Sequence, residues 1–206
     1  MAERSGGRPP APTDETVHRA DWYGADIGEV VHERVLFQDP DFDEATGTGA
    51  RFVDCTFRSG SFVGAQLESC AFENCTFVRC SFLNAELTEC KFVGSMFDEC
   101  TFDQLRVDGG TWSFVGLPGA DLRRASFTGA ELREADLTGA RLRGAKLAKC
   151  DLRSAMWSRS DVSACDLRGS QIDSLDPNEV TIGGAIVTWE QAVVLARNLG
   201  LDVRSE

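Results

Sequence analysis

Histidine is scarce in this sequence: its 206 residues include two, His18 and His32. Nucleophilic sites of the Ser–His–Asp or Cys–His kind need a histidine beside the nucleophile, and both histidines stand in the least regular part of the chain. The sequence also lacks a Walker-type phosphate loop and a GxGxxG pattern. We therefore expect a protein that is not an enzyme, with no catalytic residues, no cofactor-binding residues and no cofactor.

Long apolar runs and an excess of basic residues are missing as well. No apolar stretch approaches the roughly 20 residues that a membrane helix needs, and the first residues are not followed by the apolar core of a signal peptide. The formal net charge is −12, whereas general nucleic-acid binders carry basic patches. We expect a cytoplasmic protein that binds neither membranes nor nucleic acid directly.

A five-residue repeat organises the sequence. From Phe52 to Ile172 every fifth residue is Phe, Leu, Val, Trp or Ile, without a shift of register. The residue two places before each of these centres is usually small, as at Ala50, Cys55 and Gly60. Internal repeats are considered before other signals, because missing them assigns the wrong fold.

Neither an α-helix nor a flat β-strand keeps a period of five on one face. In an extended segment, however, the centre of each pentad and the residue two before it lie on the same side. An odd period then requires the chain to turn after every pentad, and repeated turning produces a coil. Coils stack at about 4.8 Å. The period therefore predicts a β-solenoid with a close-packed interior and no cleft for acid–base chemistry.

Several pentads carry the pattern A-D/E-L-x-x, namely residues 120–124 (ADLRR), 130–134 (AELRE) and 135–139 (ADLTG). They resemble the signature of the pentapeptide repeat family. The resemblance covers most of the chain and implies an all-β solenoid, a right-handed, four-sided (quadrilateral) β-helix with four pentads per coil. The sequence resembles most of all the gyrase-protecting members of that family, the MfpA and Qnr types.

The cysteines all occupy the small inward position, at residues 55, 70, 75, 80, 90, 100, 150 and 165. Zinc sites favour CxxC-like spacing, whereas every gap here is a multiple of five. Cysteines 20 residues apart, such as Cys55 and Cys75, would stack within disulfide range, but parallel side chains point the same way and the cytosol keeps thiols reduced. Free buried thiols that pack as small apolar residues are favoured, with no metal site.

The N-terminal end departs from the repeat. Residues 1–16 are rich in Pro and Gly and predict a disordered leader. Residues 17–175 are assigned to the β-helix, and 17–49 are interpreted as a degraded first coil, because His32, Pro40 and Gly47 do not fit the pattern. Atypical end units are expected, since an ideal terminal coil exposes an unpaired edge.

Residues 176–206 predict a C-terminal strand and helix cap. Residues 181–188 resemble a short strand, and a capping box of Thr188 and Gln191 starts a helix that runs to about Asn198. One apolar stripe of this helix is expected to cover the open end of the solenoid and to join two copies into a homodimer; it consists of Trp189, Ala192, Val193, Ala196 and Leu199.

Residues 103–119 are the weakest part of the repeat. Leu105 stands where a small residue is expected, Gly109 and Gly110 adjoin, and Phe114 lies outside the centre register. Because the count of five is kept, distorted turns are expected here and not an inserted loop.

Acidic residues gather toward the N-terminus. Residues 1–50 hold 11 acidic and 4 basic residues, whereas residues 111–175 hold 8 and 10. The acidic residues of the leading coil are the candidate partner-binding patch: Asp21, Asp26, Glu29, Glu33, Asp39, Asp41, Asp43 and Glu44.

Two functions remain open. The resemblance implies a bacterial DNA mimic that modulates or protects DNA gyrase or topoisomerase IV and so confers antibiotic resistance against a topoisomerase poison. A DNA mimic should carry phosphate-like charge along its length, and this sequence does so at one end. The alternative is a non-mimetic scaffold or protein-interaction rod with an unassigned partner.

Overall fold

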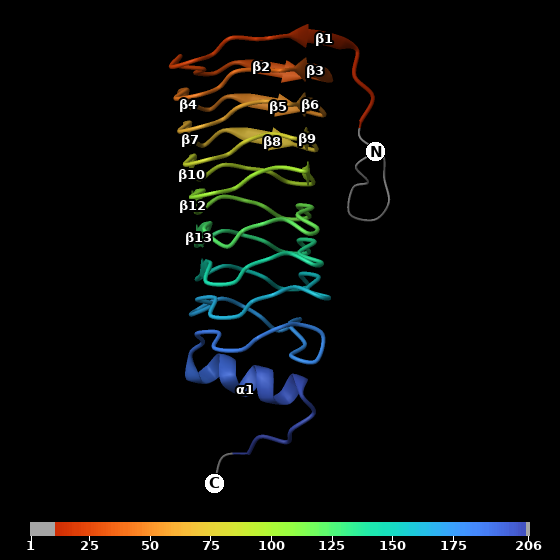
Figure 1. Ribbon diagram of the computed structural model, residues 1–206, viewed down its shortest axis with the longest axis vertical. Helices are drawn as coiled ribbons and strands as arrows, with labels where there is room; N and C mark the ends of the chain where they lie inside the picture. Colours follow the sequence, from red (N-terminus) through yellow and green to blue (C-terminus); the bar gives the residue numbers. More distant parts are fainter. Residues whose placement is uncertain (1–10, 205–206) are drawn as a thin grey trace.

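The computed structural model, which describes residues 11–204, is a rod of stacked coils (Figure 1). One coil takes 20 residues, because each strand pairs in parallel with the strand one coil later, as Phe37 does with Phe57. The chain turns after each pentad, so the rod has four walls. The predicted right-handed, four-sided β-helix is confirmed.

The four walls are lettered A to D in the order in which the chain passes through them. Walls A, C and D contain short parallel strands. Walls A and C face each other across the rod and hold the larger sheets. The strands are, on wall A, β1 (Glu15–His18), β3 (Val35–Gln38), β6 (Thr56–Arg58), β9 (Thr76–Val78) and β11 (Met96–Asp98); on wall C, β4 (Thr46–Thr48), β7 (Gln66–Glu68), β10 (Glu86–Thr88), β12 (Arg106–Asp108), β13 (Ser126–Thr128) and β14 (Lys146–Ala148); and on wall D, β2 (Val31–Glu33), β5 (Arg51–Val53) and β8 (Ala71–Glu73).

Wall B, between walls A and C, has no named strand among the described residues. Single-residue bridges join its coils, such as the parallel bridge between Ser61 and Ser81. The residue at the end of most pentads adopts a positive φ, for example 57° at Gln104, which turns the chain into the next wall.

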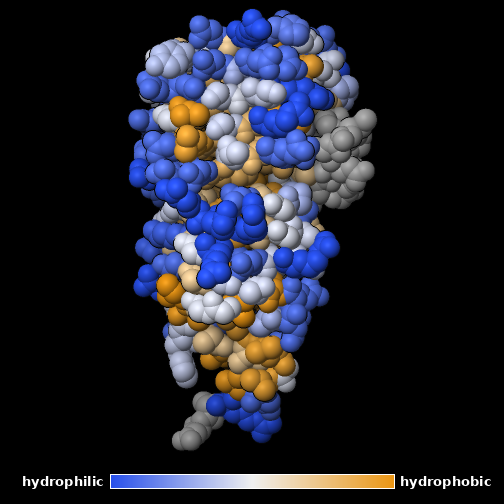
Figure 2. Space-filling view, in the orientation of Figure 1, coloured by the Kyte–Doolittle hydropathy of each residue, from blue (hydrophilic) through white to orange (hydrophobic). Residues whose placement is uncertain are grey.

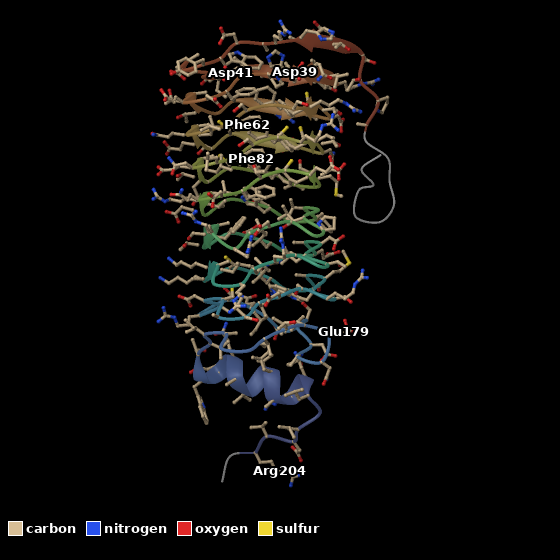
Figure 3. All side chains as sticks on the ribbon, viewed as in Figure 1. Asp39, Asp41, Phe62, Phe82, Glu179 and Arg204 are labelled. Carbon is tan, nitrogen blue, oxygen red and sulfur yellow. The ribbon has the colours of Figure 1, made fainter. Side chains whose placement is uncertain are left out.

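The interior contains the residues that the repeat predicts. On wall A the rings of Phe57, Phe77 and Phe97 stack in register, with successive centroids 4.8 Å apart. On wall B, Phe62 and Phe82 stack in the same way, 4.8 Å apart (Figure 3). This separation matches the spacing between coils, so each aromatic ring covers the next and water is excluded.

Cysteine and serine side chains share the small inward position. The Cys75 thiol donates to the carbonyl of Phe52 at 3.4 Å, and the Ser95 hydroxyl donates to the carbonyl of Phe72 at 2.7 Å. All eight cysteines are free thiols, as expected, but Cys100 is half-buried, not buried. Burial raises the pKa of Cys150 to about 11 and that of Cys165 to about 12. Both thiols therefore stay protonated.

The first coils include the residues that seemed to break the pattern. His32 points inward and stacks on Phe52, with ring centroids 5.4 Å apart. Gly47 also takes a centre position, and a Cβ there would lie 2.6 Å from Cγ1 of Ile27, so Ile27 fills that space. The leader boundary was placed too late: β1 begins at Glu15. Residues 1–10 of the expected leader lie outside the described residues.

The C-terminal segment differs from the expected strand over residues 181–188. Thr181 and Ile186 form single bridges to Asp161 and Asp166, and a turn at Gly184, with φ of 74°, separates them. The five-residue register therefore continues to the helix. The helix α1 (Trp189–Asn198) begins with the predicted capping box, in which Thr188 and Gln191 exchange hydrogen bonds.

Candidate functional site

A ring of carboxylates, here called the acidic collar, surrounds the N-terminal end of the rod. The register distributes its members over more than one wall, and Figure 3 labels two of them close to that end. Six are exposed, and Asp41 and Asp43 are half-buried. The collar consists of Asp21, Asp26, Glu29, Glu33, Asp39, Asp41, Asp43 and Glu44.

Stacking of coils brings some collar carboxylates close together. Asp21 and Asp41 are bridge partners on wall B, at the roughly 4.8 Å spacing of paired strands. Asp43 Oδ1 accepts a hydrogen bond of 2.8 Å from the backbone N–H of Val63 and another from the Ser61 hydroxyl. The backbone thus fixes the position of Asp43, and like charges one coil apart reinforce a negative potential.

No collar carboxylate forms an ion pair within the part of the chain that the structure describes. Among residues 11–204 the ion pairs of the N-terminal coils involve Asp14 and Glu73, and none involves a member of the collar. Their charge is therefore directed at solvent and is available to a basic partner.

Three aspartates in the C-terminal half, Asp121, Asp151 and Asp166, are paired with arginines. Asp121 lies 2.7 Å from Arg123 and 3.0 Å from Arg141, and Asp151 pairs with both Arg153 and Arg133. Hydrogen bonds from Arg153, and then Arg133, hold the pKa of Asp151 well below its usual range. These pairs are largely exposed and neutralise one another, so this half of the rod presents no acidic stripe.

Polar side chains of α1 cover the open end of the solenoid. Gln191 Nε2 donates to the carbonyls of Leu167 at 2.6 Å and Ser170 at 2.7 Å. Asn198 Nδ2 donates to the carbonyls of Asp173 at 3.0 Å and Leu175 at 2.8 Å. The last coil has no further coil to pair with, and side-chain amides supply the missing donors.

The predicted apolar stripe of α1 does not perform this covering. Trp189 is 80% exposed and Leu199 is 50% exposed. Ala192 is exposed, and Val193 and Ala196 are half-buried. Trp189, Ala192 and Leu199 therefore lie on the outer side of α1, whereas Leu195 packs against the core beside the hydrogen bonds of Gln191 and Asn198.

The outward stripe continues beyond α1. Ile186 is 46% exposed and Leu201 is 60% exposed. Figure 2 shows hydrophobic side chains gathered toward the C-terminal end of the rod. The roles of Gln191 and Asn198 as donors to the last coil, and the place of Ile186 and Leu201 in the outward stripe, were not predicted from the sequence; polar residues at i and i+7 opposite an apolar stripe were the available signal for the two donors.

Residues 11–204 contain neither a metal-binding cluster nor a membrane-spanning helix. No group of three His, Cys, Asp or Glu side chains there is arranged to hold a metal ion. No helix in this part of the chain has the length and apolar character to cross a membrane.

Comparison with known proteins supports the fold. Two family models match the sequence, one described as a pentapeptide repeat region over residues 50–120 and one as pentapeptide repeats (8 copies) over residues 117–144. No curated protein matches the sequence significantly.

Among solved structures, a trypsin-treated form of QnrB1, a plasmid-mediated fluoroquinolone resistance protein, is similar with a TM-score of 0.59 and 23% identity, covering 93% of this chain and 95% of that chain. A second trypsin-treated form of QnrB1 gives a TM-score of 0.52 and 22% identity, covering 95% and 100%. At these identities the likeness shows the fold. By both family models, residues 50–144 belong to the pentapeptide repeat family, and the coils share the fold of QnrB1.

Proposed function

We propose that this protein is a non-enzymatic binding protein that modulates a bacterial type II topoisomerase, DNA gyrase or topoisomerase IV, and protects it from a poison. The acidic collar takes the place of DNA phosphates opposite basic side chains of the enzyme. The observation that carries this proposal is the set of carboxylates at the N-terminal end that form no ion pair within residues 11–204. The likeness to QnrB1, a fluoroquinolone resistance protein, supports it.

The charge pattern gives the proposed mode of binding a direction. The N-terminal coils carry unpaired carboxylates, whereas Asp121, Asp151 and Asp166 farther along are neutralised by arginines. Positive and negative surfaces attract over a distance set by salt, about 8–10 Å at physiological ionic strength. The collar therefore enters the DNA-binding region first, and the mixed-charge half follows.

The C-terminal end is the proposed homodimer interface. Trp189, Leu199, Leu201 and Ile186 leave apolar side chains in water, and burying them against a second copy contributes about 25 cal/mol per Å² of apolar surface. A two-fold axis there would make one continuous rod with a collar at each end.

Light scattering tests the dimer. Trp189→Asp with Leu201→Asp is expected to convert a dimer into a monomer, while Leu83→Asp, at a side chain 36% exposed in the middle of the rod, is expected to leave the dimer intact. A wild-type protein that is monomeric at high concentration would remove the dimer from the proposal.

A supercoiling assay tests the topoisomerase proposal. Purified protein is added to gyrase or topoisomerase IV with and without a quinolone, and supercoiling or decatenation and drug-stabilised cleavage are measured. We expect less drug-stabilised cleavage and altered supercoiling. No binding at low salt, together with no change in either reaction, would reject topoisomerase modulation.

One observation favours a second function. Arginines neutralise Asp121, Asp151 and Asp166, and residues 111–175 hold 8 acidic and 10 basic residues, so this part of the rod has no net negative charge. This suits a scaffold or interaction rod that is not a DNA mimic, and such a rod would be left if the assay above shows no effect.

A further inference from the structure

The stack of coils is open at one place on wall B. Here the coil that contains Phe102 faces the next coil across a gap, which we call the open seam: residues 99–104 on one side and residues 118–124 on the other. A cavity of about 710 Å³ lies in it, lined by residues of both sides and by Arg141. This volume falls in the range of about 300–1,000 Å³ usual for ligand sites.

Backbone hydrogen bonds that join other coils are missing at the open seam. One coil earlier, the N–H of Phe82 donates to Thr101 at 2.8 Å and that of Asn84 donates to Asp103 at 2.9 Å. In the open seam the corresponding N–H groups of Phe102 and Gln104 have no acceptor within residues 11–204. The bridge series of wall B is interrupted between Thr101 and Asp121 for the same reason.

The other side of the open seam is unpaired too. The N–H of Asp121 does not reach the carbonyl of Cys100, although the N–H of Arg141 donates to Ala120 at 2.9 Å one coil later. Arg124 lacks the positive φ that ends the neighbouring pentads, as at Gln104. Cys100, at the edge of the gap, is the cysteine that is half-buried.

Leu105 accounts for the distortion. It occupies an inward small-residue position and is 1% exposed, with Ala85 and Ala125 at the same position in the adjacent coils. An oversized side chain in a close-packed interior displaces its neighbours. The aromatic stack of wall B widens beside it: the Phe82 and Phe102 centroids are 5.8 Å apart, against 4.8 Å for Phe62 and Phe82.

Charged side chains close the mouth of the open seam. Arg124 reaches across it to Asp103, with Nε 3.2 Å from Oδ1. Arg123 and Arg141 are held by Asp121 on the far side. Figure 2 shows hydrophilic side chains clustered over the middle of the rod. Phe97, Phe102, Pro118 and Ala120 contribute apolar lining.

We propose that the open seam is a binding site for an extended peptide segment of a partner protein. Facing edges with free N–H groups and free carbonyls match the alternating donors and acceptors of a peptide backbone, as in strand addition to a sheet edge. A small anion would use the donors and leave the carbonyls unpaired. The apolar lining receives one peptide side chain, and opening of the Arg124–Asp103 ion pair frees Asp103 to pair with a basic one.

The site is tested first by amide exchange and NMR on the full-length protein. The amides of Phe102, Gln104 and Asp121 are expected to exchange much faster than those of Phe82 and Asn84, because they lack hydrogen bonds. Slow exchange at Phe102 and Gln104 would overturn the proposal, since it would show a closed seam.

The binding probe is a capped peptide with the sequence of residues 120–124, acetyl-Ala-Asp-Leu-Arg-Arg-amide. We expect it to shift the resonances of Phe102, Gln104 and Asp121 and to leave Phe82 unchanged. The same peptide with N-methylated backbone amides is expected not to bind. Absence of shifts at millimolar peptide would overturn the proposal, as would equal shifts with the N-methylated peptide or with acetate or phosphate alone.

Two variants with matched controls locate the site. Leu105→Ala restores a small residue and is expected to slow seam amide exchange and to abolish the peptide shifts, whereas Val115→Ala, at an inward position where the coils are joined, should not. Arg124→Ala removes the ion pair across the mouth and should strengthen peptide binding about two- to fivefold; Arg143→Ala should not. Peptide shifts that persist in Leu105→Ala would contradict the proposed site.

Discussion

Gln191 donates a hydrogen bond of 2.6 Å from its side-chain Nε2 to the backbone carbonyl of Leu167, in the final turns of the solenoid. The same nitrogen donates to the carbonyl of Ser170 at 2.7 Å, and its side-chain oxygen accepts from the N–H of Thr188. One buried amide therefore starts the helix and also ends the stack of coils. A solenoid needs such a group, because no further coil follows to donate hydrogen bonds to the carbonyls of the last coil.

Gln191→Leu is expected to destabilise the protein by about 1–3 kcal/mol, since it leaves two buried carbonyls without a donor. Urea unfolding followed by circular dichroism measures the change. Ala192→Ser, on the exposed side of the same helix, is the control and should stay within about 0.5 kcal/mol. Equal stability of the two variants would show that the amide does not hold the cap.

Phe77→Ala should cost roughly 3–5 kcal/mol of unfolding free energy, as for other buried aromatic residues. Phe77 stacks on Phe57 and Phe97 at 4.8 Å and is 0% exposed, so the change leaves a cavity between two coils. Arg79→Ala, two residues later on the outside, should change the unfolding free energy by no more than about 0.5 kcal/mol. A small effect of Phe77→Ala in the same urea experiment would contradict the inward ladder.

Most of the fold could be predicted from the sequence, because a period of five has one structural solution that keeps both Phe77 and Cys75 inside. The ends could not be predicted as well. His32 and Gly47 were counted as misfits because each pentad was judged alone, whereas the stack lets Phe52 cover His32 and Ile27 fill the space at Gly47.

The proposed binding surfaces differ in how far they could be predicted from the sequence. The collar residues could be proposed from the sequence, because an excess of charge is visible without geometry. The orientation of α1 could not be predicted from the sequence, because apolar residues such as Trp189 are normally assigned to the buried face. The need of the last carbonyls for a donor such as Gln191 can be recognised only once the coils have been counted. The open seam had a sequence signal in Leu105, which predicted distortion but not which hydrogen bonds would be lost.

Acidification is expected to destabilise the first coils through His32. Burial lowers the pKa of His32 from its usual 6.5, with Glu15 acting in the opposite direction. Between the folded pKa and 6.5, the unfolded chain therefore binds more protons than the folded chain. The stability that neutral His32 contributes is present above about pH 6.5 and is lost as pH falls through the lower folded pKa. Melting temperatures between pH 7.5 and 5.5 measure the loss.

His32→Phe provides the control for acidification, because it keeps an aromatic ring against Phe52 and removes the titrating group. The variant should lose less stability than the wild type over the same pH range. Parallel melting curves for the two proteins would exclude His32 as the source of the pH dependence.

Neutralising exposed collar residues should weaken binding to a type II topoisomerase. Asp21, Asp26, Glu33 and Glu44 are replaced together by Asn or Gln, which keeps their oxygen acceptors and changes the net charge from −12 to about −8. The matched control makes the same charge change among carboxylates of the mixed-charge half, at Glu131, Glu134, Asp136 and Asp161.

Affinity for gyrase is measured by titration at low and at physiological salt. Wild-type binding should fall steeply as salt rises, because exposed charges are screened beyond about a Debye length. The collar variant should bind more weakly at low salt and depend less on salt, whereas the control variant should resemble the wild type. Circular dichroism checks that both variants keep the fold. Equal losses in the two variants would mean that net charge, and not the collar, governs the interaction.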